Sequence, residues 1–338
     1  MISLPFDSSS QTWLHAAARA ADWLDAHLDN ASRLPPPLHD LGSYYKWPLF
    51  LHALGRFARA RSVFETAVEH FMTLEGDFRT GTAKSSEPLY GLIADSYTNT
   101  WLIAAARIFD RPDVGRPALG CLRRRQVRAT GGFLTGRPGE HPDQRQDIVT
   151  IAGCGNAFLA WEELEEALAA GDCLLRVLDA QEPVGQELYF YIDGAGHLLR
   201  SLELPARLAV LRLYEPGQAY VYLGMAAVYL ARLALVAGES RFLNGARRYF
   251  AINQACGPAG YGGIGCCKTG WAAAVLCRLT GETLYRQSVQ QAAAAILAAQ
   301  RPEGDWDYGG SAVLNCDVTG ELGYHLTQYC LELSSGPP

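Results

Sequence analysis

Tyrosines, asparagines, lysines and carboxylic acids recur at six places along this chain, each close to the expected start of an apolar helix. Tyrosine and asparagine side chains can polarise a carbonyl or an epoxide, and a lysine such as Lys46 or Lys268 can donate to an oxyanion. A carboxylic acid can transfer a proton, and aromatic faces stabilise positive charge. An aromatic cavity with a few polar groups is typical of a small-molecule site.

These side chains form a site only if the fold brings the six helix starts together. A single tyrosine is more typical of core packing with its hydroxyl satisfied, so the grouping carries the prediction. The residues expected to converge are Tyr44, Tyr45, Lys46, Trp47, Glu87, Tyr90, Asp95, Tyr97, Asn99, Asp147, Thr150, Asn156, Glu215, Gln218, Tyr220, Tyr222, Cys266, Cys267, Lys268, Trp271, Asn315, Cys316, Asp317, Glu321, Tyr324 and His325.

Apolar residues repeat with the period of an α-helix along most of the chain, and this periodicity predicts twelve helices. Alternate segments are poor in charge and rich in Gly, Ala, Tyr, Asn and Cys, which indicates an inner ring enclosed by an outer, half-solvated ring. The expected spans are 9–28, 44–56, 59–74, 88–108, 114–127, 148–162, 164–180, 217–236, 239–255, 265–280, 282–299 and 316–333.

The predicted fold class is all-α: an (α/α)6 toroid of six helical hairpins in a single domain over residues 1–338. Gly238 and Gly281 are expected to end helices in a left-handed conformation. Three long connections, 34–40, 130–147 and 188–213, are expected at the mouth where the inner helices begin, and residues 186–200 are expected to form a small β-hairpin insertion there.

Composition narrows the classes of partner. The formal net charge is −6, and Arg123-Arg124-Arg125 is a short basic run expected on a solvated helix end, so no nucleic acid partner is expected. No integral membrane segment and no signal peptide are apparent. Nine scattered cysteines are typical of reduced, buried thiols. A cytoplasmic monomer or small homo-oligomer with a hydrophobic small-molecule substrate is therefore expected.

Two motifs resemble those of known toroid families. Gln300-Arg301-Pro302-Glu303-Gly304-Asp305-Trp306 is similar to the QW repeat of squalene-hopene and oxidosqualene cyclases, and Gly131-Gly132-Phe133 resembles a turn of the same terpenoid cyclase and protein prenyltransferase-like superfamily. The QW-like segment is structural, because the Gln side chain can bond backbone at a helix end while the Trp packs across the turn. The chain is about half the length of those two-domain cyclases.

Asp317-Val318-Thr319-Gly320-Glu321 resembles the Asp-Cys-Thr-Ala-Glu motif of the oxidosqualene cyclases. The resemblance implies that Asp317 is a general acid, a role that suits a buried carboxylic acid with a raised pKa. The alternative interpretation is that Asp317 only caps the N-terminus of the last helix.

A second resemblance concerns a cysteine pair and a histidine, which could bind zinc. Cys266-Cys267 and Tyr324-His325 resemble the zinc ligands of prenyltransferase β-subunits, although Ile264 stands where that family has an Asp. The Cys-His-Gly signature of the lanthionine cyclases is absent. A buried Cys pair and a cavity or core His is the favoured interpretation of these residues. The site is therefore expected to hold no metal and no cofactor.

The third resemblance is to six-hairpin glycosidase-like toroids, through Gly270–Leu276 and Arg278–Gly281. It implies a carbohydrate-active enzyme, a glycoside hydrolase, lyase or epimerase, with Asp95, Glu215, Asp317 and Glu321 as candidate carboxylates. A non-catalytic binding or scaffold toroid is a further alternative.

The favoured hypothesis is a metal-independent cyclase or isomerase of secondary metabolism, acting on a hydrophobic terpenoid or polyketide intermediate. Its expected catalytic residues are Asp317, Tyr220 and Asp95. Its expected substrate-binding residues are Tyr44, Tyr45, Trp47, Tyr97, Asn99, Asn156, Gln218, Tyr222, Lys268, Trp271, Tyr324 and His325.

Overall fold

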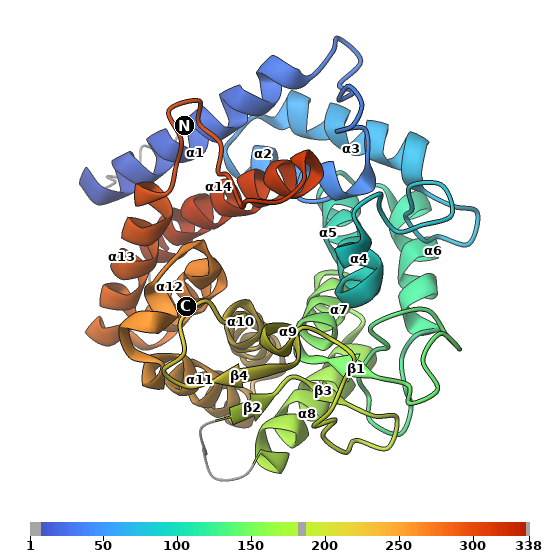
Figure 1. Cartoon of the computed structure of the whole chain (residues 1–338), viewed down its shortest axis with the longest axis vertical. Helices are drawn as coiled ribbons and strands as arrows, with labels where there is room; N and C mark the ends of the chain where they lie inside the picture. Colours follow the sequence, from blue (N-terminus) through green and yellow to red (C-terminus); the bar gives the residue numbers. More distant parts are fainter. Residues whose placement is uncertain (1–7, 182–186, 336–338) are drawn as a thin grey trace.

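The chain folds as an (α/α)6 toroid, a single domain in which an outer ring of helices surrounds an inner ring (Figure 1). The computed structural model describes residues 8–181 and 187–335. The inner helices are α2 (Trp47–Ala53), α5 (Asp95–Ile108), α7 (Ile148–Ala160), α10 (Val221–Ala237), α12 (Cys267–Thr280) and α14 (Ala312–Ser334). The outer helices are α1 (Ser8–His27), α3 (Phe57–Phe71), α6 (Pro112–Arg123), α8 (Leu164–Ala180), α11 (Ser240–Ala255) and α13 (Thr283–Ala298).

Each inner helix packs against the outer helix that follows it, and α14 closes the ring by packing against α1 from the other end of the chain. The composition of the two rings explains this arrangement. Every residue of α12 from Cys267 to Cys277 is buried, whereas α3 buries only a stripe that contains Val63, Phe64 and Ala67. A helix enclosed on all sides lacks a polar face, and a surface helix keeps one.

Helix ends follow local chemistry. Gly238 and Gly281 have φ angles of 69° and 71° and end α10 and α12 in the left-handed conformation, which glycine adopts without a steric penalty, so this prediction is confirmed. Asp147 caps α7 by accepting a hydrogen bond from the Thr150 amide. Ser311 caps α14 in the same way through Leu314, so α14 begins four residues earlier than predicted.

The predicted helix over 88–108 is interrupted. Ala94 has φ −137° and ψ 15°, so the segment divides into a short helix α4 (Pro88–Ile93) and the inner helix α5. Single 3-10 turns, η1 (Leu41–Ser43), η2 (Gly257–Tyr261) and η3 (Ile264–Cys266), complete the entries to the ring, and α9 (Ala206–Ala209) is one further short helix near the mouth.

Two small antiparallel sheets lie at the mouth. β1 (Gln146–Asp147) pairs with β3 (Tyr191–Ile192), and β2 (Glu187–Tyr189) pairs with β4 (Val210–Arg212). The hairpin predicted over 186–200 pairs with itself only at the bridge between Ile192 and Leu198, because its strands bond to these other partners; residue 186 lies outside the described residues.

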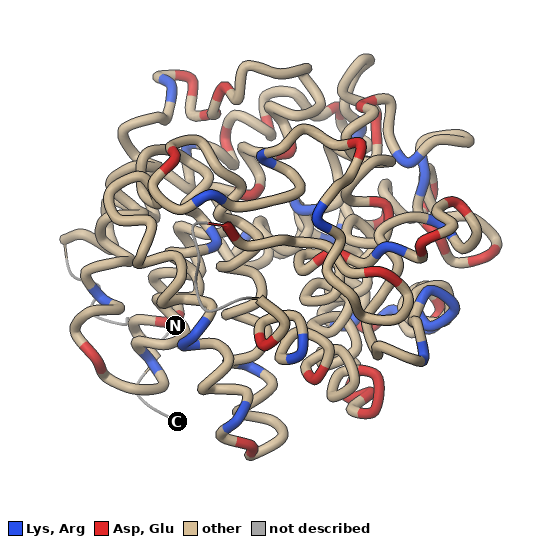
Figure 2. Tube along the Cα trace, turned by 60° about the horizontal axis from the view of Figure 1, so that its bottom comes forward, with Lys and Arg blue, Asp and Glu red and all other residues tan. Residues whose placement is uncertain are grey.

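All nine cysteines are buried and none forms a disulfide. Basic and acidic positions are interspersed along the trace in the view of Figure 2. Within the described residues, no helix combines the length and the apolar character that crossing a membrane requires. Arg125 differs from the expectation for its basic run: it is buried, because its guanidinium binds Asp77 and Asp95.

Candidate active site

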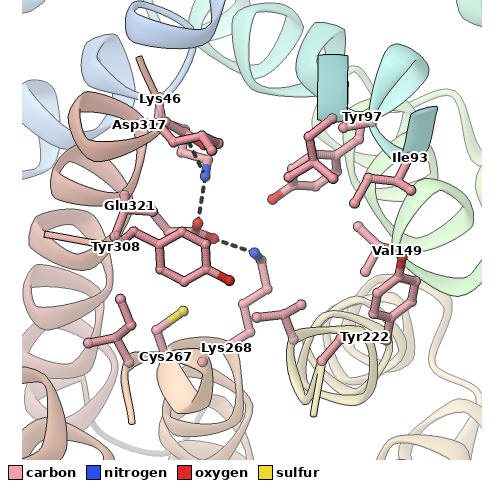
Figure 3. A pocket seen from close by; sticks show the side chains of 18 of the residues that line it. Lys46, Ile93, Tyr97, Val149, Tyr222, Cys267, Lys268, Tyr308, Asp317 and Glu321 are labelled. Carbon is pink, nitrogen blue, oxygen red and sulfur yellow. Dashed lines mark hydrogen bonds and ion pairs between the residues drawn. The ribbon is translucent and has the colours of Figure 1, made fainter. Parts of the chain in front are cut away.

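A cavity of about 220 Å³ lies where the inner helices begin (Figure 3). Residues just before or within the first turns of all six inner helices line it, so the six helix starts do converge at one mouth. The lining is mostly apolar and aromatic: Tyr45, Lys46, Leu89, Tyr90, Ile93, Ala94, Tyr97, Val149, Leu208, Gln218, Ala219, Val221, Tyr222, Ile264, Gly265, Cys267, Lys268, Tyr308, Leu314, Asp317, Val318, Glu321 and Leu322.

Two lysines and two carboxylates form one charged cluster on this wall (Figure 3). Lys46 Nζ lies 2.8 Å from Asp317 Oδ1 and 2.5 Å from Glu321 Oε2. Lys268 Nζ binds the other Glu321 oxygen, Oε1. All four side chains are at least 88% buried, since none exposes more than 12% of its side-chain surface. Such charges persist in an apolar wall only when they are paired.

Asp317 is held by hydroxyl groups as well. Tyr90 donates a hydrogen bond of 2.6 Å to Asp317 Oδ2, and Tyr45 donates one of 3.3 Å to the same oxygen. The Ser311 cap places Asp317 in the second turn of α14, so it is not the N-cap of that helix. Its side chain therefore lines the cavity and does not cap the helix.

The two carboxylates differ in their acidity. Burial raises the pKa of Asp317, and the neighbouring Glu321 raises it further, although the Lys46 ammonium opposes both effects. Burial would also raise the pKa of Glu321, but Lys268 and Lys46 outweigh it and hold that pKa well below the usual range. Carboxyl groups with opposed pKa shifts divide the acid and base roles between them. Asp317 is thus the weaker acid of the pair and Glu321 the stronger.

Local structure sets this geometry. Asp317 and Glu321 are four residues apart on α14 and therefore lie on one face, one turn apart. Gly320, between them, faces Trp47, and a Cβ there would meet the indole at 3.0 Å. The glycine lets α14 approach α2, which brings Lys46 within reach of both acids.

Tyr97 adds an unused polar group. It is 4% exposed, and its hydroxyl has no hydrogen-bond partner in the part of the chain that the structure describes. Its oxygen points into the cavity, opposite the charged cluster (Figure 3). Lys268 Nζ lies 5.5 Å from the centre of its ring. A buried hydroxyl left unpaired is available to a bound ligand.

Of the catalytic and substrate-binding residues predicted for the favoured hypothesis, the structure brings six to the cavity wall: Tyr45, Tyr97, Gln218, Tyr222, Lys268 and Asp317. A second group lies directly behind the wall. Trp271, Tyr324 and His325 pack together, with ring centres 5.1 to 5.8 Å apart. His325 Nε2 is 3.6 Å from Glu321 Oε1, and burial lowers the pKa of His325 to about 4.

The other predicted residues do not line the cavity. Asp95 forms ion pairs with Arg79 and Arg125, and Asn99 bonds Lys84 and Asp77. These contacts direct both side chains into a separate buried network, although Asp95 begins an inner helix as expected.

Backbone contacts account for further members of the predicted set. The Tyr220 hydroxyl donates to the Glu215 carbonyl, the Tyr44 hydroxyl accepts from the Leu34 amide, and Asn156 donates to the carbonyl of the preceding turn. Trp47, the first residue of α2, is buried against Gly320 of α14. Helix periodicity gives the face on which a side chain lies only coarsely, so it did not separate these side chains from those in the cavity.

Lys46, Tyr90 and Glu321 line the cavity as well. All three were expected at the mouth, and Glu321 was a candidate carboxylate of the carbohydrate-active alternative, but none was among the predicted catalytic or substrate-binding residues of the favoured hypothesis. A signal for Glu321 exists in the sequence, since Asp317, Glu321 and His325 follow one another at four-residue spacing. Its partner Lys46 is 275 positions away along the chain, and no local pattern reveals that contact.

The residues suggested for zinc do not form a favourable metal site. Ligand atoms of Cys267, Glu321 and His325 lie within 4.8 Å of one another, whereas the Cys266 thiol donates instead to the Ala292 carbonyl. Both Glu321 oxygens are already bound by ammonium groups. Two adjacent positive charges oppose a divalent cation, so we assign no chemistry to a metal here.

Comparisons with known proteins identify similar folds but no related family. No family model matches the chain, and no curated protein matches it. Among solved structures, a D-mannose isomerase superimposes with a TM-score of 0.68 at 11% identity, over 98% of this chain and 99% of that one. A family 76 glycoside hydrolase from a bovine Bacteroides thetaiotaomicron strain gives 0.64 at 11% identity, over 94% and 77%.

A different class of enzyme matches about as well. The type II terpene cyclase MstE from Scytonema, in complex with the substrate geranylgeranyl dihydroxybenzoate, gives a TM-score of 0.63 at 12% identity, over 96% of this chain and 99% of that one. The same toroid is thus shared with carbohydrate enzymes and with terpene cyclases. A fold does not fix a function, so the choice rests on the site.

Proposed function

We propose that this chain is an enzyme that isomerises or cyclises a small hydrophobic molecule, of the terpenoid or polyketide class, inside the central cavity. The observation that carries the proposal is the pairing of Asp317 and Glu321 in a mostly apolar wall, with the pKa raised for the first and lowered for the second. A buried acid beside a fixed anion suits proton transfer to a weakly basic substrate atom.

The proposed chemistry balances without an external reagent. Asp317 gives its proton to an alkene, epoxide or carbonyl of the substrate, and the resulting carboxylate later accepts a proton from a neighbouring carbon. The product therefore has the mass of the substrate. In this proposal Lys268 and the Tyr97 hydroxyl bind a substrate oxygen, which is supported by the lack of a hydrogen-bond partner for that hydroxyl among the described residues. The aromatic rings of the wall offset positive charge as it develops on the substrate.

The second candidate is a carbohydrate-active enzyme, and one observation favours it: both Asp317 and Glu321 line the cavity. Glycosidases place their two carboxyl groups on either side of the scissile bond, about 5 to 9.5 Å apart. Here both carboxylates bind one ammonium, that of Lys46. This shared cation leaves no room for a sugar between them, so we rank this function second.

The test uses solvent deuterium. Hydrophobic terpenoid and polyketide candidates are incubated with the protein in D2O, and the products are analysed by mass spectrometry. We expect an isomer of the substrate; where an alkene is protonated, this isomer carries one carbon-bound deuterium, whereas a deuteron on an epoxide or carbonyl oxygen is lost by exchange. We expect Asp317→Asn to reduce formation of the isomer at least about a hundredfold.

The matched control is Asp147→Asn. Asp147 is also a fully buried aspartate whose pKa burial raises, but it caps α7 and does not line the cavity. Asparagine caps helices about as well as aspartate, so this variant keeps its activity. Hydrolysis products, or equal activity in Asp317→Asn and wild type, would contradict the proposal.

A further inference from the structure

A second pocket, of about 570 Å³, lies beside the mouth and outside the central cavity. Its lining consists of Arg79, Ala83, Lys84, Ser85, Pro88, Gly91, Asp95, Arg137, Pro138, Gly139 and Glu140. The short helix α4 separates the two spaces: Leu89, Tyr90 and Ile93 line the central cavity, whereas Pro88 and Gly91 line the second pocket.

The floor of this pocket is a buried ionic network with three cations and two carboxylates. Asp77 binds Lys84, Arg79 and Arg125 at 2.9, 2.7 and 2.9 Å, measured between nitrogen and carboxylate oxygen. Asp95 binds Arg79 at 3.0 Å and Arg125 at 2.6 Å. Each of these five side chains exposes 9% or less of its surface. One positive charge in the network therefore has no carboxylate of its own.

Arg79 carries the unused hydrogen-bonding capacity. Its Nη2 group serves both Asp77 and Asp95, while its Nη1 group is buried and has no partner among the described residues. A guanidinium group normally places its donors on planar, anionic acceptors such as carboxylate or phosphate. A buried donor without an acceptor is costly and indicates a missing partner.

The behaviour of Lys84 agrees with a surplus of positive charge. Its side chain is completely buried, and burial, with Arg125 nearby, lowers its pKa to about 8 although Asp77 and Asp95 oppose the shift. A nearby anion would stabilise the ammonium form. Asp40, a further buried acid, is already engaged, because it accepts hydrogen bonds from Gly42, Ser85 and Ser86.

We propose that this second pocket binds a small oxyanion, a phosphate or carboxylate group, between the buried Arg79 and Arg137 at the rim. Arg137 is exposed, and its guanidinium donates a hydrogen bond only to the Thr82 carbonyl among the described residues, which leaves its other donors for the ligand. Glu140 also lines the rim, and its carboxylate accepts from the Arg137 amide. The proposal does not depend on the function proposed for the central cavity.

The experiment measures the melting temperature of the full chain against phosphate concentration, with chloride replacing phosphate at constant ionic strength. A ligand that binds only the folded state raises Tm in a saturable way. We expect such a rise with phosphate, with acetate or with both, and the anion that acts identifies the ligand class. Arg137→Ala should raise the apparent Kd about tenfold or more, because it removes a charge-assisted contact.

Arg124→Ala is the matched control. Arg124 is likewise exposed and donates one hydrogen bond to a loop carbonyl, that of Glu75, but it does not line the pocket. Its anion response should equal that of wild type. Arg79→Lys keeps the buried positive charge but removes the paired donors of the guanidinium group, so it should also weaken anion binding. If this variant does not fold, the anion response of Arg137→Ala tests the proposal. Equal Tm in phosphate, acetate and chloride, or an unchanged response in Arg137→Ala, would overturn the proposal.

Discussion

At the scale of single residues, two carboxyl groups of the cavity wall, one helical turn apart on α14, have different surroundings. Glu321 has an ammonium group on each oxygen, whereas Asp317 has one ammonium and two tyrosine hydroxyls. This difference in partners gives the opposed pKa shifts. The proposed acid is therefore selected by its neighbours and not by its residue type.

His325 behind the wall leads to a pH prediction. Burial lowers its pKa from 6.5 to about 4 in the folded chain, so the unfolded chain takes up the proton first as the pH falls. Its contribution to stability is complete above pH 6.5 and is lost as the pH falls towards 4. Because of His325, we expect the unfolding free energy to fall by about 2 kcal/mol when the pH is lowered from 7.5 to 5.

Urea unfolding of wild type and of His325→Phe across this pH range measures the contribution. Phe cannot titrate, so the stability difference between the two proteins should change by about that amount in favour of the variant at low pH. Curves that stay parallel would show that His325 does not titrate as a buried neutral group.

At the scale of elements, the turn after α13 fixes the last hairpin to the first helix. Gln300 Nε2 donates to the Ala16 carbonyl of α1 at 2.9 Å and to the Gly304 carbonyl at 2.7 Å. Trp306 is fully buried, and its indole donates to the Ile296 carbonyl. The QW-like segment thus serves the structural role that its residue types indicated.

Gly304 is the most constrained residue of this turn and gives the next prediction. Its φ is +103°, and an added Cβ would lie 2.5 Å from the Arg19 carbonyl oxygen. Gly304→Ala should lower the unfolding free energy by about 2–4 kcal/mol, because both strain and overlap oppose it. Gly309→Ala is the control: φ is +72°, but no atom lies within 4 Å, so about 1 kcal/mol is expected. Urea denaturation of both variants compares them, and equal losses would contradict the close contact.

At the scale of the whole molecule, the ring is closed by its two ends. α1 packs against α14, so the sixth hairpin combines the first helix of the chain with the last. Contacts of this kind join residues more than 280 positions apart, as between Gln300 and Ala16. Ring stability therefore depends on a non-local interface that forms only when the rest of the toroid is in place.

A pair of charge substitutions in α1 tests this closure. Ala17 is completely buried, and His15, two residues away, is exposed. Ala17→Glu should lower the unfolding free energy by at least about 3 kcal/mol, because an unpaired charge would be buried. His15→Glu should change it by less than about 0.5 kcal/mol. Thermal and urea unfolding compare the two; a tolerated Ala17→Glu would mean that α1 is dispensable for the ring.

The sequence by itself determined the helices, their alternation between an inner and an outer ring, and the meeting of the inner helix starts at one mouth. These follow from periodicity, from charge and from glycine caps, all of which are local in the chain. Asp317 was singled out by the resemblance of a contiguous segment of α14, and it does line the cavity. Its neighbour Glu321, a candidate carboxylate of the carbohydrate-active alternative, lines the cavity too.

Only the tertiary structure decided which of the mouth residues face the cavity. Asp95 and Tyr97 are two positions apart on α5, yet Asp95 turns to Arg79 and Arg125 whereas Tyr97 faces the cavity. The ammonium groups that bind Asp317 and Glu321 come from other segments: Lys46 precedes α2, and Lys268 lies in α12. Charge pairing in a buried wall is set by distances between segments that are far apart in the sequence, and periodicity carries no information about those distances.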